Sequence, residues 1–196
     1  MFIILFWFTQ AACAGEAPWI RVDPAGNTLQ VIQNDKPVLS FDNISIGRNG
    51  YARNRVQGDG KTPLGVFRVA WKNPNSRFHL FFGLDYPSQD HAEQAFRDKR
   101  IDFDTYYEIR RALYFGEVPP QTTALGGYIG IHGVGAGNPR VHEAANWTEG
   151  CVALTDDQID QLARWVDIGT LVVIADDATI PALAYVPQQA PKTVAR

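Results

Sequence analysis

The stretch WIRVDPAGNTLQVIQNDKPVLSFDNISIG, residues 19–47, has the period of a β-sheet. Apolar and polar residues alternate in three short runs, and turn-forming residues gather between them at Pro24–Asn27 and Asn34–Pro37. Such alternation is typical of strands with one buried face, and Pro, Gly, Asn and Asp are the residues that tight turns require. The stretch therefore predicts a β-meander.

Two further strands follow this meander. LGVFRVAW (64–71) and FHLFF (78–82) continue the β pattern, and the polar segment KNPNSR (72–77) between them is predicted to be a turn.

The middle of the chain changes to a helical period. Asp90 with Glu93 has the form of a capping box, which predicts a helix running to about Lys99. The segment DTYYEIRRALYFGE (104–117) predicts a second helix that ends near Gly116. We expect both helices to be insertions among strands.

The last third returns to short strands. GGYIGIHG (126–133) predicts a buried strand that ends at His132, and TLVVIA (170–175) predicts the last strand. Thr155 and Gln158 form a capping box at the start of a helix with one apolar face. Many strands, few helices and no regular βαβ alternation predict a mainly β fold, an antiparallel β-sandwich or barrel with inserted helices.

Length and composition predict one soluble folded domain. The chain has 196 residues, of which 45% are hydrophobic and 20% charged, and this leaves no room for a second module. A net charge of -3 without a basic cluster argues against nucleic acid as the main partner. We expect a catalytic domain over residues 15–176 and a Pro/Ala-rich tail over residues 177–196.

The N-terminal segment MFIILFWFTQAACAGEAP predicts export to the periplasm or cell envelope. An apolar run from Phe2 to Phe8 precedes small residues, and Ala12–Ala14 fits a cleavage site, so residues 1–14 are predicted to be an export signal. One alternative is a lipoprotein signal that ends at Cys13 and carries a lipid anchor there. Another is a plain apolar tail, because no Lys or Arg precedes the apolar run as in a usual export signal. Either form of export leaves Cys151 as the only free thiol in an oxidising compartment, which indicates a reactive group.

Cys151 and His132 are candidates for a catalytic pair within IHGVGAGNPRVHEAANWTEGCVALT (131–155). A thiol becomes a good nucleophile when an imidazole takes its proton, and dipoles of the predicted following helix would add thiolate character. The amides of Gly150 and Cys151 could stabilise an oxyanion. The alternative is structural: a histidine ending a strand and a small buried cysteine are common core features.

Two other motifs are weaker. GDGKT (58–62) lacks the first glycine of a phosphate-binding loop, since Arg55 stands there, and Pro63 disfavours the helix that should follow, so we expect a solvated turn and no nucleotide. The glycines between residues 130 and 137 do not fit a dinucleotide motif, and no helix is predicted at Pro139. They predict a flexible loop.

A zinc site is the remaining alternative. Its candidate ligands are His132, His142, Glu143 and Cys151, but neither an H-E-x-x-H pattern nor a C-x-x-C pair is present. The sequence therefore favours no metal.

Several motifs in order resemble one family. IHG (131–133) followed by WTEGCVALTDDQIDQL (147–162) resembles the L,D-transpeptidase catalytic domain, also called YkuD, whose signature is His-Gly and then Ser/Thr-x-Gly-Cys. GDGKTPLGVFRV (58–69) is similar to its upstream element, and NPNSRFHLFFGLDYPSQD (73–90) looks like the YafK-like branch.

The resemblance implies a cysteine acyltransferase of the bacterial cell envelope, involved in cell-wall organisation and cell shape. Cys151 would be the nucleophile and His132 the general base, with the Gly150 and Cys151 amides as the oxyanion site and Gly133 and Thr148 as supporting residues. The thiolate would attack the third residue of a peptidoglycan stem peptide, expel the terminal D-alanine and pass the acyl group to an amine. No metal or cofactor is implied.

The chain departs from the usual family pattern at two positions. Glu149 replaces a histidine before Gly-Cys, and Ala153 replaces an arginine two residues after the cysteine. Without the arginine, the site lacks a guanidinium whose N–H donors could orient carbonyls or a carboxylate. Glu149 would oppose formation of the thiolate if its carboxylate faced the thiol. Basic residues nearby are interpreted as ordinary solvated charges, with stem-peptide contact as the alternative: Arg53, Arg55, Lys61 and Arg140.

Three hypotheses on function stay open. The first is transpeptidation. The second is an amidase on the same scaffold that releases a cross-link or a peptidoglycan-bound lipoprotein, and the third is an inactive module that binds the cell wall.

Overall fold

The predicted meander begins the part of the chain that the computed structural model describes, residues 16–176. Strands β1 (Trp19–Asp23), β2 (Thr28–Gln33) and β3 (Lys36–Phe41) pair antiparallel in that order. Asn27, Asn34 and Asp35 adopt positive φ in the two turns, a conformation that Asn and Asp tolerate better than most residues. The predicted export signal and the predicted tail lie outside the described residues.

The main sheet has eight strands in the order β3-β2-β1-β10-β6-β7-β8-β9. Most neighbours are antiparallel, but β1 pairs with β10 and β8 with β9 in parallel. The mainly β fold is therefore confirmed, with a mixed sheet in place of a wholly antiparallel one. The remaining strands are β6 (Gly65–Ser76), β7 (His79–Leu84), β8 (Gly130–His132), β9 (Val152–Ala153) and β10 (Leu171–Ile174), and β4 (Tyr51–Ala52) and β5 (Thr62–Pro63) form a separate small parallel pair.

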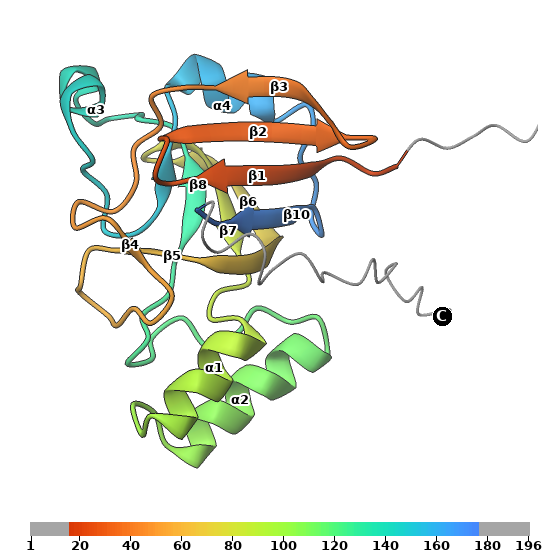
Figure 1. Ribbon diagram of the computed structural model, residues 1–196, viewed down its shortest axis with the longest axis vertical. Helices are drawn as coiled ribbons and strands as arrows, with labels where there is room; N and C mark the ends of the chain where they lie inside the picture. Colours follow the sequence, from red (N-terminus) through yellow and green to blue (C-terminus); the bar gives the residue numbers. More distant parts are fainter. Residues whose placement is uncertain (1–15, 177–196) are drawn as a thin grey trace, which may run out of the picture.

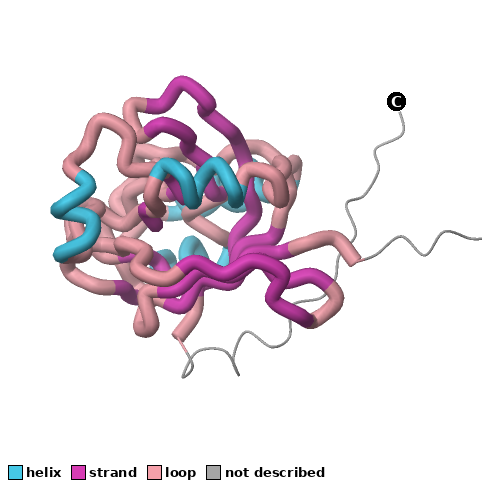
Figure 2. Tube along the Cα trace, turned by 90° about the horizontal axis from the view of Figure 1, so that it is seen from above, coloured by secondary structure: helices cyan, strands magenta, loops and turns pink. Residues whose placement is uncertain are grey.

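The two edges of the main sheet approach each other. After β3 the chain crosses to β9, where Ser45 and Ala153 exchange two backbone hydrogen bonds of 2.9 and 2.7 Å, and Gly47 bridges to Thr148. In Figure 1, β6, β7 and β8 pass behind β1 and β2, and the view from above in Figure 2 shows strands on more than one side of the molecule. This closure encloses the core. It also brings residues 44–48 beside the turn that carries Cys151, residues 148–151, which is called the cysteine turn below.

Strand β6 corrects one prediction. The segment KNPNSR is not a turn, because β6 continues through it to Ser76 and pairs with β7. The pairing slips between Asn73 and Ser76, and such an irregularity tolerates Pro74, which has no N–H to donate. The connection between the strands is reduced to Arg77 and Phe78.

Helices α1 (Gln89–Arg97) and α2 (Phe103–Tyr114) pack together at one end of the molecule, seen at the bottom of Figure 1. The capping box predicted at Asp90 is wrong. The N-cap of α1 is Ser88, whose hydroxyl bonds to His91 Nδ1, while Asp102 caps α2 by accepting from the Thr105 amide.

The two later helices differ in how well the sequence predicts them. The capping box of α4 (Asp156–Leu162) is confirmed, with both reciprocal bonds between Thr155 and Gln158 present. The short helix α3 (Pro139–Ala144) contradicts the expectation of no helix there. Asn138 accepts from the Arg140 amide, and proline at a first helical position already has a suitable φ.

Apolar side chains from both ends of the main sheet and from α1, α2 and α4 form one core cluster. No helix within residues 16–176 is long and apolar enough to cross a membrane.

Candidate active site

His132 and Cys151 lie on neighbouring strands at one edge of the sheet. His132 is the last residue of β8, and Cys151 directly precedes β9. The parallel register pairs Ile131 with Val152 and His132 with Ala153, so Cys151 is level with Gly130, two residues before the histidine. Because alternate strand residues share a face, this register puts the His132 and Cys151 side chains on the same side of the sheet.

The His132 imidazole is buried and held in one tautomer. Its Nδ1 lies 2.7 Å from the Gly133 carbonyl oxygen, and since a carbonyl only accepts, Nδ1 must donate. In the neutral ring the unprotonated nitrogen is then Nε2, which is available as a base. Burial lowers the pKa of His132 to about 4, so the ring is neutral at neutral pH.

Three aromatic rings fix the plane of the imidazole. Phe78 stacks on His132 at 4.3 Å between ring centroids, Phe81 stacks at 5.9 Å, and Trp147 meets it edge-on at 5.7 Å. Phe78 and Phe81 are not among the predicted site residues, although the β pattern predicted for their strand could have suggested Phe81, which pairs with His132 across β7 and β8.

Gly133 has no room for a side chain. A Cβ there would lie 2.5 Å from Asp156 Oδ1 and 2.9 Å from the Phe78 carbonyl oxygen. The glycine thus lets the chain after β8 pass against α4 and the β6–β7 connection, and its carbonyl orients His132. This is the position predicted for a supporting residue.

The turn that carries Cys151 is held by Thr148. The buried Thr148 hydroxyl donates to the Cys151 carbonyl at 2.6 Å and accepts from the Gly150 amide at 3.1 Å. Gly150 adopts φ +132°, which favours glycine. Because the Gly150 amide already has a partner, it would have to share or exchange that bond to serve an oxyanion, and its predicted role stays a prediction.

The Cys151 thiol is partly buried and donates to the Tyr128 carbonyl at 3.4 Å. Burial raises the pKa of Cys151 to about 11, although a hydrogen bond from the Gly130 amide and the positive charge of Arg55 act in the opposite direction. At neutral pH the resting site therefore holds a neutral thiol and a neutral imidazole.

Cys151 does not directly precede a helix, so the predicted help from a helix dipole stays a prediction. Helix α4 begins at Asp156, and β9 separates it from Cys151. The influence of a helix terminus falls off within its first turn.

The neutral pair is suited to proton transfer that accompanies nucleophilic attack. For this step the thiol must exchange the Tyr128 carbonyl for His132 Nε2, and catalytic hydrogen bonds often tighten only when substrate binds.

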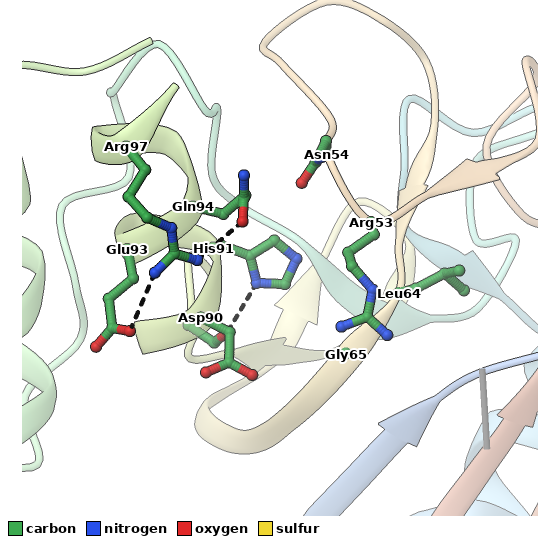
Figure 3. A pocket seen from close by; sticks show the side chains of 10 residues that line it. Arg53, Asn54, Leu64, Gly65, Asp90, His91, Glu93, Gln94 and Arg97 are labelled. Carbon is green, nitrogen blue, oxygen red and sulfur yellow. Dashed lines mark hydrogen bonds and ion pairs between the residues drawn. The ribbon is translucent and has the colours of Figure 1, made fainter. Parts of the chain in front are cut away.

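A pocket of about 310 Å³ adjoins the cysteine turn. Tyr128 and Glu149 line it on the side of the turn, and Arg55 and Gln121 contribute from other segments. A second pocket, of about 230 Å³, lies between α1 and the segments around Arg53 and Leu64 (Figure 3). Neither pocket is lined by His132 or Cys151 themselves, but the first reaches Glu149, two residues before Cys151, and is therefore the candidate substrate site.

The remaining predicted residues lie as follows. His142 is buried and accepts at Nδ1 from the Trp147 indole at 3.2 Å, so it supports an aromatic neighbour of His132. Within residues 16–176 no group of three metal-ligating side chains could hold an ion. The interpretation of Arg55 as a solvated charge is wrong, because its side chain is buried, whereas Arg53 and Arg140 are exposed.

The GDGKT segment is a tight turn. The Asp59 carboxylate accepts from the amides of Val56 and Lys61. Thr62 is fully buried, and its hydroxyl accepts from the Gly47 amide at 2.8 Å. The segment thus holds residues 44–48 in place beside the cysteine turn.

The fold is similar to that of solved bacterial proteins. Pgp2, a helical cell shape determining protein from Campylobacter jejuni, is 20% identical with a TM-score of 0.57 over 83% of this chain and 50% of that chain. Bd1075 from Bdellovibrio bacteriovorus is 19% identical with a TM-score of 0.53 over 85% of this chain and 50% of that chain. The chain thus spans about half the length of these structures, and at such identities the likeness shows the fold alone.

No curated protein sequence matches the chain significantly. The family model of the L,D-transpeptidase catalytic domain (YkuD) matches residues 17–174, which is nearly all of the described chain. The chain therefore belongs to the L,D-transpeptidase catalytic domain family.

Proposed function

We propose that the protein is an exported cysteine acyltransferase that acts on peptidoglycan stem peptides. The observation that carries the proposal is the placement of Cys151, directly before β9, on the same face of the sheet as His132 at the end of the neighbouring strand β8, with Nε2 as the basic nitrogen of a neutral imidazole. The pocket beside Tyr128 and Glu149 offers a place for the peptide. Membership of the family supports the choice of substrate class.

In the proposed acylation, Nε2 of His132 takes the thiol proton as Sγ attacks the carbonyl of the third stem residue. The Cys151 and Gly150 amides stabilise the oxyanion, and the terminal D-alanine leaves with the proton held by His132. A thioester on Cys151 remains. His132 then takes a proton from the acceptor amine, which attacks the thioester and releases the thiol.

Hydrolysis is the second candidate outcome, and Ala153 favours it. This residue is fully buried, pairs with His132 and bonds to Ser45 through the backbone, so the position where the family resemblance expects an arginine fork has no such side chain. A different acceptor, with water in place of the amine, would turn the same thioester chemistry into an amidase acting on a stem peptide or a peptidoglycan-bound lipoprotein.

The test is intact-mass analysis after incubation with a disaccharide-tetrapeptide, with a tripeptide amine acceptor in half of the samples. Wild-type protein should form a transient adduct, and Cys151→Ala should form none while keeping its circular dichroism spectrum. A 3-3 linked dimer in the samples with acceptor establishes the transferase, and release of free tripeptide alone establishes the hydrolase. Turnover by Cys151→Ala would contradict the covalent mechanism. Absence of both adduct and product, with this substrate and with lipoprotein-linked muropeptide, would favour a binding module.

A further inference from the structure

Arg55 is a buried and incompletely paired cation beneath the cysteine turn. Its side chain is 4% exposed, which is rare for arginine. Nη2 donates to the Val56 carbonyl at 3.4 Å, and Nε lies 3.4 Å from Asp59 Oδ1 without making a hydrogen bond. Nη1 has no hydrogen-bond partner. A buried donor left unpaired is costly, so its retention points to a second role.

Two glycines make room for this guanidinium. A Cβ on Gly150 would lie 3.3 Å from Arg55 Nη1 and 2.7 Å from the Lys61 carbonyl oxygen, and a Cβ on Gly126 would lie 3.4 Å from Nη2. Nη1 therefore reaches the residue that directly precedes the nucleophile. The ring of Tyr86, 5.5 Å from Arg55 Cζ, closes the other side and helps to exclude water.

The other charged groups around the turn are paired, exposed or neutral. Glu149 forms an ion pair with Arg48, and both side chains are about half or more exposed, where solvent screens them. His132 is neutral at neutral pH. The Lys61 side chain is partly exposed, and Asp59 is the counter-charge of Arg55 itself. Arg55 is thus the deeply buried cation among the described groups next to Cys151.

We propose that Arg55 is a positioning residue whose positive charge stabilises the thiolate of Cys151 as its proton leaves. The usual family arginine would follow the cysteine by two residues, but Ala153 occupies that place, and Arg55 brings a guanidinium to the turn from the other side of the fold. An opposite charge within a few ångströms favours the ionised form of a thiol by about one to three pKa units. This inference deepens the proposed function, because it concerns the same nucleophile.

The test is the rate of alkylation of Cys151 by iodoacetamide in the purified full-length protein at several pH values from about 7 to 9. Peptide mapping separates the label on Cys151 from that on Cys13. Only the thiolate reacts, so below the thiol pKa the rate measures the thiolate fraction. Arg55→Gln should react about tenfold more slowly at each pH, a shift of about one unit, and Arg55→Lys should lie closer to wild type.

Arg53→Gln is the matched control. It removes an exposed arginine two residues away that lines the other pocket (Figure 3), and its rate should equal that of wild type. Equal rates in Arg55→Gln and wild type would overturn the inference.

Asp59→Asn is predicted to change the alkylation rate in the opposite direction, and this test does not depend on whether the Arg55 variants fold. It removes the counter-charge of Arg55, so Cys151 should react faster; an unchanged or slower rate would overturn the inference. No stem peptide is used, so these results stand apart from the proposed function, which fails separately if wild-type protein acylates no muropeptide.

Discussion

The two halves of the candidate site are held by different forces. His132 is fixed by packing, since it is buried between Phe78, Phe81 and Trp147 and makes one short hydrogen bond to a backbone carbonyl. Cys151 is fixed by polar contacts of its own turn, in which a single hydroxyl bonds to two backbone groups.

This difference separates orientation from reactivity. The aromatic rings give His132 a defined plane and tautomer, but the same burial removes its charge. Burial also opposes ionisation of Cys151, and there the nearby charge of Arg55 acts in the opposite direction. Variants of each half should therefore fail in different ways.

Removing the base should have the largest effect. His132→Ala takes away the proton acceptor, and we expect kcat/KM to fall by about 10²- to 10⁴-fold, the usual range for general-base catalysis. The measurement is muropeptide turnover followed by chromatography. The exposed histidine of β7, in His79→Ala, is the matched control and should leave turnover unchanged. Wild-type rates in His132→Ala would remove this residue from the role of base.

Loosening the cysteine turn should have a smaller effect. Thr148→Val deletes the hydroxyl that bonds to the Cys151 carbonyl and the Gly150 amide, leaving two backbone groups short of a partner. We expect kcat/KM to fall by about tenfold and the free energy of unfolding to fall by about 1 to 3 kcal/mol. Urea denaturation and turnover measure the two quantities. Thr148→Ser, which keeps the hydroxyl, should recover most of both, and failure to do so would assign the loss to the methyl group.

The pH dependence reports on both halves together. Since the pKa of His132 is about 4 and that of Cys151 about 11, both groups are neutral between these values. We expect kcat/KM to vary by less than about threefold from about pH 5 to 9. A sigmoidal change with a midpoint near neutral pH would show a thiolate–imidazolium pair and contradict the neutral site.

The lowered pKa of His132 predicts that the folded protein loses stability in acid. The folded pKa of His132 lies below its ordinary value of 6.5, so the unfolded chain binds more protons as the pH falls from about 6.5 to about 4. His132 therefore contributes stability above this window and loses it within the window. The urea midpoint of wild type should fall with pH more steeply than that of His132→Phe, and equal slopes would contradict the shift.

The smallest effect is expected at Glu149. Its carboxylate is paired with Arg48 and its side chain is 66% exposed, so it points to solvent and not toward the thiol. Glu149→Gln should change the alkylation rate of Cys151 by less than about twofold, because exposed ion pairs contribute little. An increase of tenfold would show that the charge acts on the thiol directly.

Local sequence patterns predicted a large part of this fold. The meander over residues 19–47, the strand ending at His132 and the capping box at Thr155 all arise from contacts between near neighbours. The errors at KNPNSR and at Asp90 occurred where one particular partner, a neighbouring strand or a histidine side chain, decides the local structure. Strand β7 extends β6 through Pro74, and His91 takes the Ser88 hydroxyl away from the usual cap.

The sequence by itself determined the mainly β architecture, the family motifs and the two candidate catalytic residues, because period, turn chemistry and motif spacing are properties of neighbouring positions. The tertiary structure alone decided the aromatic enclosure of His132, the neutral state of the pair and the burial of Arg55 against Gly150. These depend on which side chains exclude water from one another, and Arg55 and Gly150 are far apart in the chain. No local pattern of residues encodes a contact of that kind.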